Sequence, residues 1–381
     1  MKKPNKYLIF ALILAIINLI AVFLIFGVLI EKESRALIRA AHWMMGRLED
    51  PLVSVWISIF RPLAPLLSLP FEFLGEGMGL LIQSIVFYLL AIYFIFKITE
   101  IVYKDQLQAL FASIFYAFAI PALNYSLAFK ATNFGSWFFC IFSIYLTLLY
   151  FKKRHEKLLI FNGLISGLGF LMKENGGLGI LFFIAMVLLS KEFGLKEKVL
   201  KIIKFSAFFI TPIILWEITV LVLTPFSHLD VFSHVWRTYI IEEGPIKTLS
   251  ALTHLLALFA TFGLLGWLVV LWGALKEWQN KNKERMKILL ALVPFSSVSL
   301  IWPFPDTRHA FIVGTLGALL ASYGLINLKN IFKNKKIGLL LIIVILSLYI
   351  VFNYLSYYFD DTLPFIDFEN ILNFLKVQEF Y

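Results

Sequence analysis

Eleven long apolar stretches, separated by more polar segments, divide this chain of 381 residues. An apolar helix of about 20 residues, rising ~1.5 Å per residue, crosses the ~30 Å hydrocarbon core of a bilayer. The stretches lie near residues 7–30, 77–97, 107–123, 134–151, 158–172, 177–190, 205–223, 249–275, 288–302, 309–327 and 337–356. This pattern predicts an all-α, polytopic transmembrane helix bundle with about 11 spans.

The charged residues between these stretches predict the orientation of the bundle. With the N-terminus in the cytoplasm, 23 of the 34 Lys and Arg residues and seven of the 24 Asp and Glu residues lie inside. The outer side then carries 11 basic and 16 acidic residues, and Glu217 lies within a span. A basic bias in short cytoplasmic loops is the known orientation signal. We therefore expect a multi-pass protein of the cell membrane with a cytoplasmic N-terminus and an outer C-terminus, and the basic inner face explains the net charge of +10 without nucleic-acid binding.

The composition excludes a soluble domain, because 60% of the residues are hydrophobic and only 15% are charged. The single cysteine, Cys140, falls in the fourth apolar stretch, so no disulfide can form within the chain. His228, Asp230 and His234 are too loosely spaced to predict a metal site. The sequence has no Gly-rich nucleotide loop and no Ser-His-Asp arrangement. We expect neither a metal nor a cofactor.

The long polar segments all lie on the predicted outer side, where we therefore expect the chemistry. Residues 1–381 are interpreted as a single transmembrane domain, and residues 31–76, the first outer loop, carry the candidate catalytic site. Residues 33–46 of this loop place Leu37, Ile38, Ala41, Met44 and Met45 at helical spacing, with Gly46 as the terminator. This spacing predicts an amphipathic helix that lies at the membrane interface.

Three features of the outer segments together point to a known family. The first outer loop begins with acidic residues and a short helix that ends at Gly46, Arg61-Pro62 follows it, and a later outer turn has the sequence Lys173-Glu174-Asn175-Gly176. This pattern resembles the polytopic glycosyltransferases with a GT-C fold, the relatives of protein mannosyltransferase and aminoarabinose transferase. The resemblance covers most of the chain but is carried by few positions. In the apolar stretch before the Lys173-Glu174 turn, the small residues Gly163 and Gly167 are expected to let the helix pack closely on a neighbouring helix.

The resemblance implies that a sugar is transferred from a polyprenyl-phosphate carrier to an acceptor on the outer side, with inversion and with a carboxylate as general base. When Gly46 is matched to the family's glycine, Glu31 stands at the position of the family's catalytic Asp; Glu33 does so if the loop is matched two residues later. Such a carboxylate must lie within ~2.6–3.2 Å of the attacking hydroxyl to accept its proton. The family's second acidic residue and its Tyr are replaced by Lys32 and Arg35, so a relative that binds the lipid without transferring sugar stays open.

A cation is needed where negative charge develops on the leaving phosphate. Arg61 occupies the family's basic-Pro position, and its planar guanidinium matches phosphate oxygens. Lys130, Lys173 and Arg308 are the other outer cations that we expect at the donor phosphate. Arg308 follows Pro303-Phe304-Pro305 and precedes a helix rich in small residues, where the family tends to place an Arg; snorkelling to water is the alternative.

Four further polar residues are expected to line the acceptor cavity, namely Glu174, Glu217, Arg237 and His309. For Glu174 and its neighbour Lys173 the alternative is a solvated turn at the membrane surface. Glu217 lies about two turns below the outer surface, where ionisable residues usually face the interior of the bundle or a wet cavity. A neutral carboxylic acid that joins two helices by a hydrogen bond is the alternative for Glu217.

The expected partners are a polyprenyl-phosphate-linked sugar, membrane lipid, and a glycan, lipid or protein acceptor. The cytoplasmic loops are too short and too basic to bind a sugar nucleotide. The alternative function is that of a non-catalytic transporter or flippase-like protein for a lipid-linked or amphipathic solute. Alternating-access transporters use a midplane site, often with repeats and broken helices. The sequence shows no repeat and only Glu217 well inside a span, which favours the enzyme.

Overall fold

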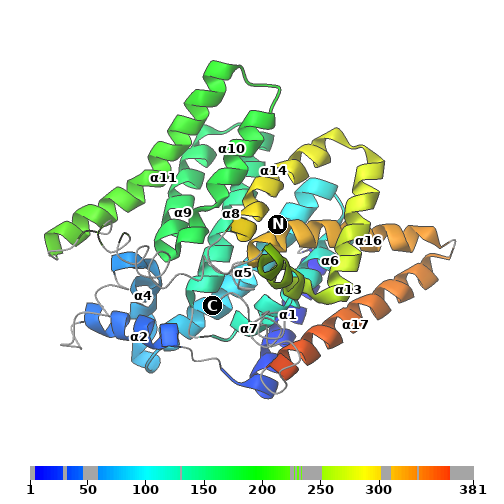
Figure 1. The fold of residues 1–381 in the computed structure, drawn as a ribbon, viewed down its shortest axis with the longest axis horizontal. Coiled ribbons are helices and arrows are strands. Elements are labelled where there is room, and N and C mark those ends of the chain that lie inside the picture. The colour runs from blue at the N-terminus through cyan, green and yellow to red at the C-terminus, as the bar shows by residue number, and fades with distance from the viewer. Residues whose placement is uncertain are drawn as a thin grey trace, which may run out of the picture.

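The computed structural model describes residues 5–28, 32–45, 59–128, 131–223, 227, 230, 233, 251–301, 310–332 and 334–360. Within these residues the chain is helical and contains no β-strand (Figure 1). The helices are α1 (Lys6–Phe26), α2 (Lys32–Met44), α4 (Leu63–Ser68), η1 (Leu69–Leu74), α5 (Met78–Tyr103), α6 (Gln106–Ala117), α7 (Ile120–Tyr125), α8 (Ala131–Lys153), α9 (Glu156–Met172), η2 (Glu174–Gly177), α10 (Gly179–Leu189), α11 (Leu195–Leu223), α13 (Ala251–Asn280), α14 (Lys283–Ile301), η5 (Phe311–Val313), α16 (Gly314–Ile331) and α17 (Lys335–Asp360). The predicted all-α polytopic bundle is confirmed.

Seven helical segments in the described part of the chain are long and apolar enough to cross a membrane. They are α1, α5, α8, α11, α13, the continuous η5 and α16, and α17. The other four predicted spans fall on α6 with α7, α9, α10 and α14, which are also helical. Because α6 and α10 have only 12 and 11 residues, the total of 11 spans stays a prediction.

The main buried core draws on every α-helix of the described chain except α11. That helix runs along the edge of the bundle beside α9 (Figure 1), and most of its side chains face outward. A smaller core attaches it, in which the Phe183 ring of α10 stacks on the Phe205 ring of α11 with centroids 4.3 Å apart. At the outer edge, α4 lies against α2 and α9. These contacts place the first outer loop beside the α9–α11 pair.

Small residues permit the closest helix contacts, as is common in membrane bundles. A Cβ on Gly167 of α9 would overlap the Phe209 carbonyl oxygen of α11 and would press on Pro212. A Cβ on Gly273 of α13 would overlap the Leu320 carbonyl oxygen of α16. In both places a side chain would have to push two helix backbones apart.

We expect Gly273→Ser to destabilise the protein by about 1–3 kcal/mol, the usual cost of overpacking. Gly194→Ser is the matched control, because no heavy atom lies within 4 Å of a Cβ built at that exposed position. Thermal unfolding in detergent micelles measures the effect. Equal unfolding temperatures for the two variants would mean that α13 and α16 are not in the close contact described.

The α6–α7 segment is broken at Phe118 and Ala119, inside the bundle. The break frees carbonyl oxygens of the last turn of α6, and buried side chains of other helices donate hydrogen bonds to them. These bonds run from Tyr349 Oη to Phe115 O (3.0 Å), from Asn18 Nδ2 and Tyr88 Oη to Ala117 O (3.3 Å each), and from Asn353 Nδ2 to Phe118 O (2.8 Å). Irregular backbone at membrane depth is tolerated where protein groups satisfy it in this way.

A second interruption lies in α13 at Gly263, whose φ of 62° is in the left-handed region that favours glycine. The Trp267 indole donates a hydrogen bond of 2.9 Å to the Leu258 carbonyl oxygen across this break. Broken helices are typical of transporters as well as of other membrane proteins. At both breaks, however, side chains of the protein itself occupy freed carbonyl oxygens, which indicates a structural role.

Candidate functional site

The outer turn after α9 is held in place by close backbone contact. A Cβ on Gly169 would overlap the Gly176 carbonyl oxygen, and a Cβ on Gly176 would overlap the Gly169 carbonyl oxygen. The buried Cys140 thiol of α8 lies 3.0 Å from the Asn175 carbonyl oxygen, to which it donates a hydrogen bond. Because the turn folds back on the end of α9, Lys173 and Glu174 are fixed at one end of the bundle, which is the predicted outer end.

Lys173 points into the bundle. Its side chain is 2% exposed, and its Nζ donates a hydrogen bond of 2.8 Å to Asn133 Oδ1 in the first turn of α8. A buried ammonium requires polar or charged neighbours. This arrangement excludes the solvated surface turn that the sequence left open for the Lys173 side chain.

Arg61 and Glu174 form a two-point ion pair. Arg61 Nη2 lies 2.9 Å from Glu174 Oε1, and Arg61 Nε lies 3.2 Å from Oε2. The guanidinium also lies 5.1 Å from the centroid of the Phe60 ring. Both side chains of the pair are less than one-fifth exposed. The pair joins the first outer loop to the α9–α10 turn, 113 residues later in the chain.

The charges of this cluster set the protonation of Glu174. Burial alone would raise the pKa of Glu174, but the Arg61 guanidinium, with Lys173 as a second cation, holds it below its usual value. Glu174 is therefore a carboxylate at neutral pH. Among the described residues, one carboxylate and two cations give this cluster a net positive charge.

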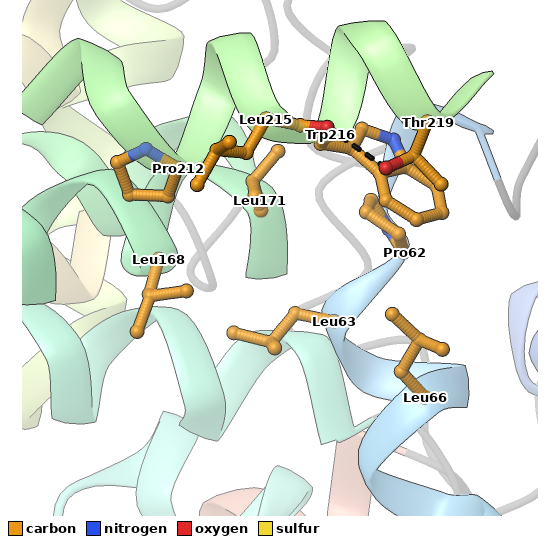
Figure 2. Close-up of a pocket in the computed structure, with 9 residues that line it drawn as sticks. All are labelled: Pro62, Leu63, Leu66, Leu168, Leu171, Pro212, Leu215, Trp216 and Thr219. Atoms are coloured by element: carbon orange, nitrogen blue, oxygen red, sulfur yellow. Dashed lines mark hydrogen bonds between the residues drawn. The ribbon is translucent and has the colours of Figure 1, made fainter. Parts of the chain in front are cut away.

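An apolar groove with a volume of about 270 Å³ lies between three segments of the chain (Figure 2). The first lining residue along the chain is Pro62, which directly follows Arg61. The groove walls come from three helices that meet at the edge of the bundle. They are Pro62, Leu63 and Leu66 of the α4 segment, Leu168 and Leu171 of α9, and Pro212, Leu215, Trp216 and Thr219 of α11. The Trp216 indole donates a hydrogen bond of 2.9 Å to the Ile59 carbonyl oxygen, which ties α11 to the segment that leads into Arg61.

The predicted amphipathic helix of the first outer loop is confirmed as α2. Leu37, Ile38 and Ala41 are buried toward the bundle, and Arg35 and Arg39 are exposed. Glu33 lies in the first turn of α2, but its side chain is outside the described part of the structure, and Glu31 lies outside the described residues altogether. Their assignment as the general base stays a prediction.

The structure brings three of the predicted site residues together, namely Arg61, Lys173 and Glu174. Lys130, Arg237, Arg308 and His309 lie outside the described residues. Glu217 is half-buried on α11, adjacent in sequence to Trp216, and is not among the residues that line the groove. Its role as the floor of an acceptor cavity stays a prediction.

The groove was not predicted from the sequence, because Leu and Pro side chains that line a groove look the same as those that face lipid. A partial signal was the pair Gly163 and Gly167 on α9. These glycines were expected to permit close packing on a neighbouring helix, and they do so against α11. No group of three His, Cys, Asp or Glu residues that could hold a metal ion occurs in the described chain, but His228 and His234 lie outside it.

Part of the chain matches a known protein family. Residues 62–216 match the family model described as dolichyl-phosphate-mannose-protein mannosyltransferase. The matched segment runs from the start of the groove wall at Pro62 to Trp216 and includes the Lys173–Glu174 turn. No curated protein and no solved structure matches the chain. The match confirms the resemblance found in the sequence: over residues 62–216, this membrane protein is similar to the dolichyl-phosphate-mannose-protein mannosyltransferase family of GT-C-type glycosyltransferases.

Proposed function

We propose that this protein transfers a sugar from a polyprenyl-phosphate carrier to an acceptor at the outer face of the membrane. The observation that carries the proposal is the position of the Arg61–Glu174–Lys173 charge cluster beside an apolar groove. A polyprenyl-phosphate sugar is itself an anionic headgroup on a long apolar tail. The two parts of the site therefore match the two parts of the donor.

The groove is accessible to a lipid tail from the membrane. Leu66 and Leu215 are 38% and 61% exposed, so this part of the groove wall borders the lipid-facing surface. Removal of the tail's apolar surface from lipid gains little, so the groove serves chiefly to orient the carrier. Because Pro62 of the groove wall directly follows Arg61 in the chain, a carrier in the groove would hold its headgroup near Arg61.

The phosphate would meet two cations and one carboxylate. Guanidinium binds phosphate oxygens through parallel N–H donors, and a phosphate that approaches Arg61 competes with the Glu174 carboxylate. Lys173 supplies a second positive charge in a buried place, where electrostatic stabilisation of a leaving phosphate is strongest. Lys130 and Arg308 are assigned to the same phosphate, and Arg237 and His309 to the cavity wall, from their predicted outer positions; for Arg308 the family resemblance adds support.

In the proposed reaction, a carboxylate at the start of α2 takes the proton of the acceptor hydroxyl. The acceptor oxygen then forms a bond to the anomeric carbon of the sugar, and the bond from that carbon to the phosphate oxygen breaks with inversion. Its electron pair leaves with polyprenyl phosphate, which the cations stabilise. Glu31 is the first candidate for the base and Glu33 the second.

The groove is tested by Leu66→Trp, which fills it from the α4 side. We expect KM for a long-chain polyprenyl-phosphate sugar to rise by roughly tenfold, as for other steric changes in apolar sites, with little change in kcat. Leu67→Trp is the matched control, because Leu67 is equally exposed on the same helix and does not line the groove. An equal effect of both variants, or no effect of either, would argue against the groove as the carrier site.

The same preparation separates the enzyme from the alternative transporter. In sealed vesicles, the enzyme produces a glycosylated acceptor and free polyprenyl phosphate. A transporter or flippase-like protein would instead move the lipid-linked sugar between the leaflets and leave the sugar–phosphate bond intact. The predicted cytoplasmic N-terminus and outer C-terminus determine which leaflet must hold the donor.

A further inference from the structure

Glu72 is a buried carboxylate that the proposed reaction does not use. It lies in η1, and its side chain is fully buried. Its Oε2 accepts a hydrogen bond of 2.9 Å from the Gly77 amide. Its Oε1 has no hydrogen-bond partner within the described part of the chain. A buried carboxylate requires compensation by charge or by hydrogen bonds.

The neighbouring titratable group comes from α2. His42, in the last turn of this helix, places its Nε2 3.9 Å from Glu72 Oε2, and its side chain is 21% exposed. This distance is within ion-pair range but longer than a hydrogen bond. An imidazole carries a full positive charge only when it is protonated, and histidine is the side chain type that ordinarily changes its charge between pH 5 and 8.

Within the described part of the chain, few other charged side chains lie near this contact. Arg35 and Arg39 are the other described basic side chains of α2, and both are exposed. Glu76 is exposed beyond η1, and Arg61, just before α4, is paired with Glu174. The residues of α4 and the first three turns of α5, which pack against α2 and η1, carry no charge. His42 is thus the basic group nearest to Glu72 among the described side chains.

We propose that Glu72 is a positioning residue, which docks the C-terminal end of α2 by pairing with protonated His42 and thereby aims the carboxylates at the N-terminal end of this helix. The inference rests on the proposed function for its effect on catalysis. Glu33 lies nine residues before His42 on the same helix, or roughly 14 Å at 1.5 Å per residue. A tilt of α2 at His42 therefore displaces Glu33 and the preceding Glu31. General base catalysis is sensitive to displacements of about 1 Å.

The first experiment measures kcat for sugar transfer between pH 6 and 8.5. In the wild type, we expect kcat to be roughly threefold to tenfold lower at the alkaline end of this range than at the acid end, the size expected for a partly screened charged contact. Glu72→Gln keeps an oxygen for the Gly77 amide but removes the charge, and His42→Gln removes the cation. Both variants should stay at the low alkaline value over the whole range, without a change in donor KM.

Rescue by a permanent cation distinguishes positioning by charge from simple packing. His42→Lys should keep the high kcat up to pH 8.5, because lysine retains its charge there. Glu76→Gln is the control, since this carboxylate is exposed and lies four residues after Glu72. A wild-type pH profile in both Glu72→Gln and His42→Gln would overturn the proposal.

The second experiment detects docking without catalysis. Trypsin cleaves after Arg35 and Arg39 only when α2 leaves the bundle and unfolds locally. The rate of cleavage in α2 is divided by the rate at the exposed residues 152–157 in the same sample. In the wild type this ratio should be higher at pH 8.5 than at pH 6. In Glu72→Gln it should be equally high at both pH values. If neither the wild type nor any variant transfers sugar but the cleavage rates follow this pattern, the proposed function fails and the docking contact stands. If α2 is cleaved at the same rate in all proteins at both pH values, the docking contact fails.

Discussion

Glu31→Gln is expected to lower the rate of sugar transfer by roughly 10²–10⁴-fold, the usual contribution of a general base. Its effect on donor affinity should be small, because the base acts mainly in the transition state. Glutamine keeps the size of the side chain but cannot accept the proton of the acceptor hydroxyl. The measurement is single-turnover transfer in membranes supplied with a polyprenyl-phosphate sugar, with lipid binding determined separately.

The informative comparison is with Glu33→Gln, because the two residues correspond to two matches of the first outer loop. The match that aligns Gly46 predicts that Glu31→Gln loses transfer and Glu33→Gln retains most of it. Glu76→Gln, an exposed carboxylate elsewhere on the predicted outer side, controls for the loss of one negative charge. Loss of transfer in Glu33→Gln alone would shift the match by two residues. Full activity in both would remove the central residue of the enzyme hypothesis and support lipid binding or transport.

Features set by local periodicity were predicted well from the sequence. The amphipathic pattern of residues 33–46 predicted α2 to within two residues at its end, because its buried face repeats at helical spacing. The apolar stretches predicted the bundle because an apolar run of about 20 residues is long enough to cross the hydrocarbon core as a helix. The spacing of Gly163 and Gly167 predicted close helix packing, but their partner, α11, could not be named from the sequence.

Features that depend on contacts between distant segments were only partly predicted. Arg61 and Glu174 were each chosen as site residues, yet their ion pair spans 113 residues and has no signature in either segment. Glu72 was not chosen, because its burial and its approach to His42 arise only when η1 folds against α2 and α5. The break between α6 and α7 was missed, because the apolar run continues through it.

The ion pair between Arg61 and Glu174 is expected to stabilise the outer end of the bundle. Glu174→Gln leaves the largely buried Arg61 without its carboxylate, which should cost about 2–3 kcal/mol, somewhat less than the loss of a partner from a fully buried pair. Arg61→Gln should cost a similar amount. The double variant should cost less than the two together, because both single changes break the same ion pair. Unfolding temperatures that add without coupling would contradict the pair.

The pH dependence of this stabilisation follows from the direction of the pKa shift. Since the pKa of Glu174 is lowered in the folded protein, the pair contributes fully above the ordinary pKa of a glutamate, about 4.3. The contribution is lost as the pH falls through the lowered value. The difference in stability between wild type and Glu174→Gln should therefore be constant between pH 6 and 8 and should shrink only in acid.

Donor binding separates a phosphate role of Arg61 from its structural role. If Arg61 holds the donor phosphate, Arg61→Gln should weaken binding of the polyprenyl-phosphate sugar by about 1.5–3 kcal/mol, as for other charged hydrogen bonds. Glu174→Gln should not weaken it, because the amide competes less with phosphate for the guanidinium than the carboxylate does. The two variants thus lose similar stability but differ in donor affinity. Equal weakening of donor binding in both variants would mean that the ion pair acts only by holding the Lys173–Glu174 turn in place. Of the three clustered residues, Lys173 alone would then contact the phosphate.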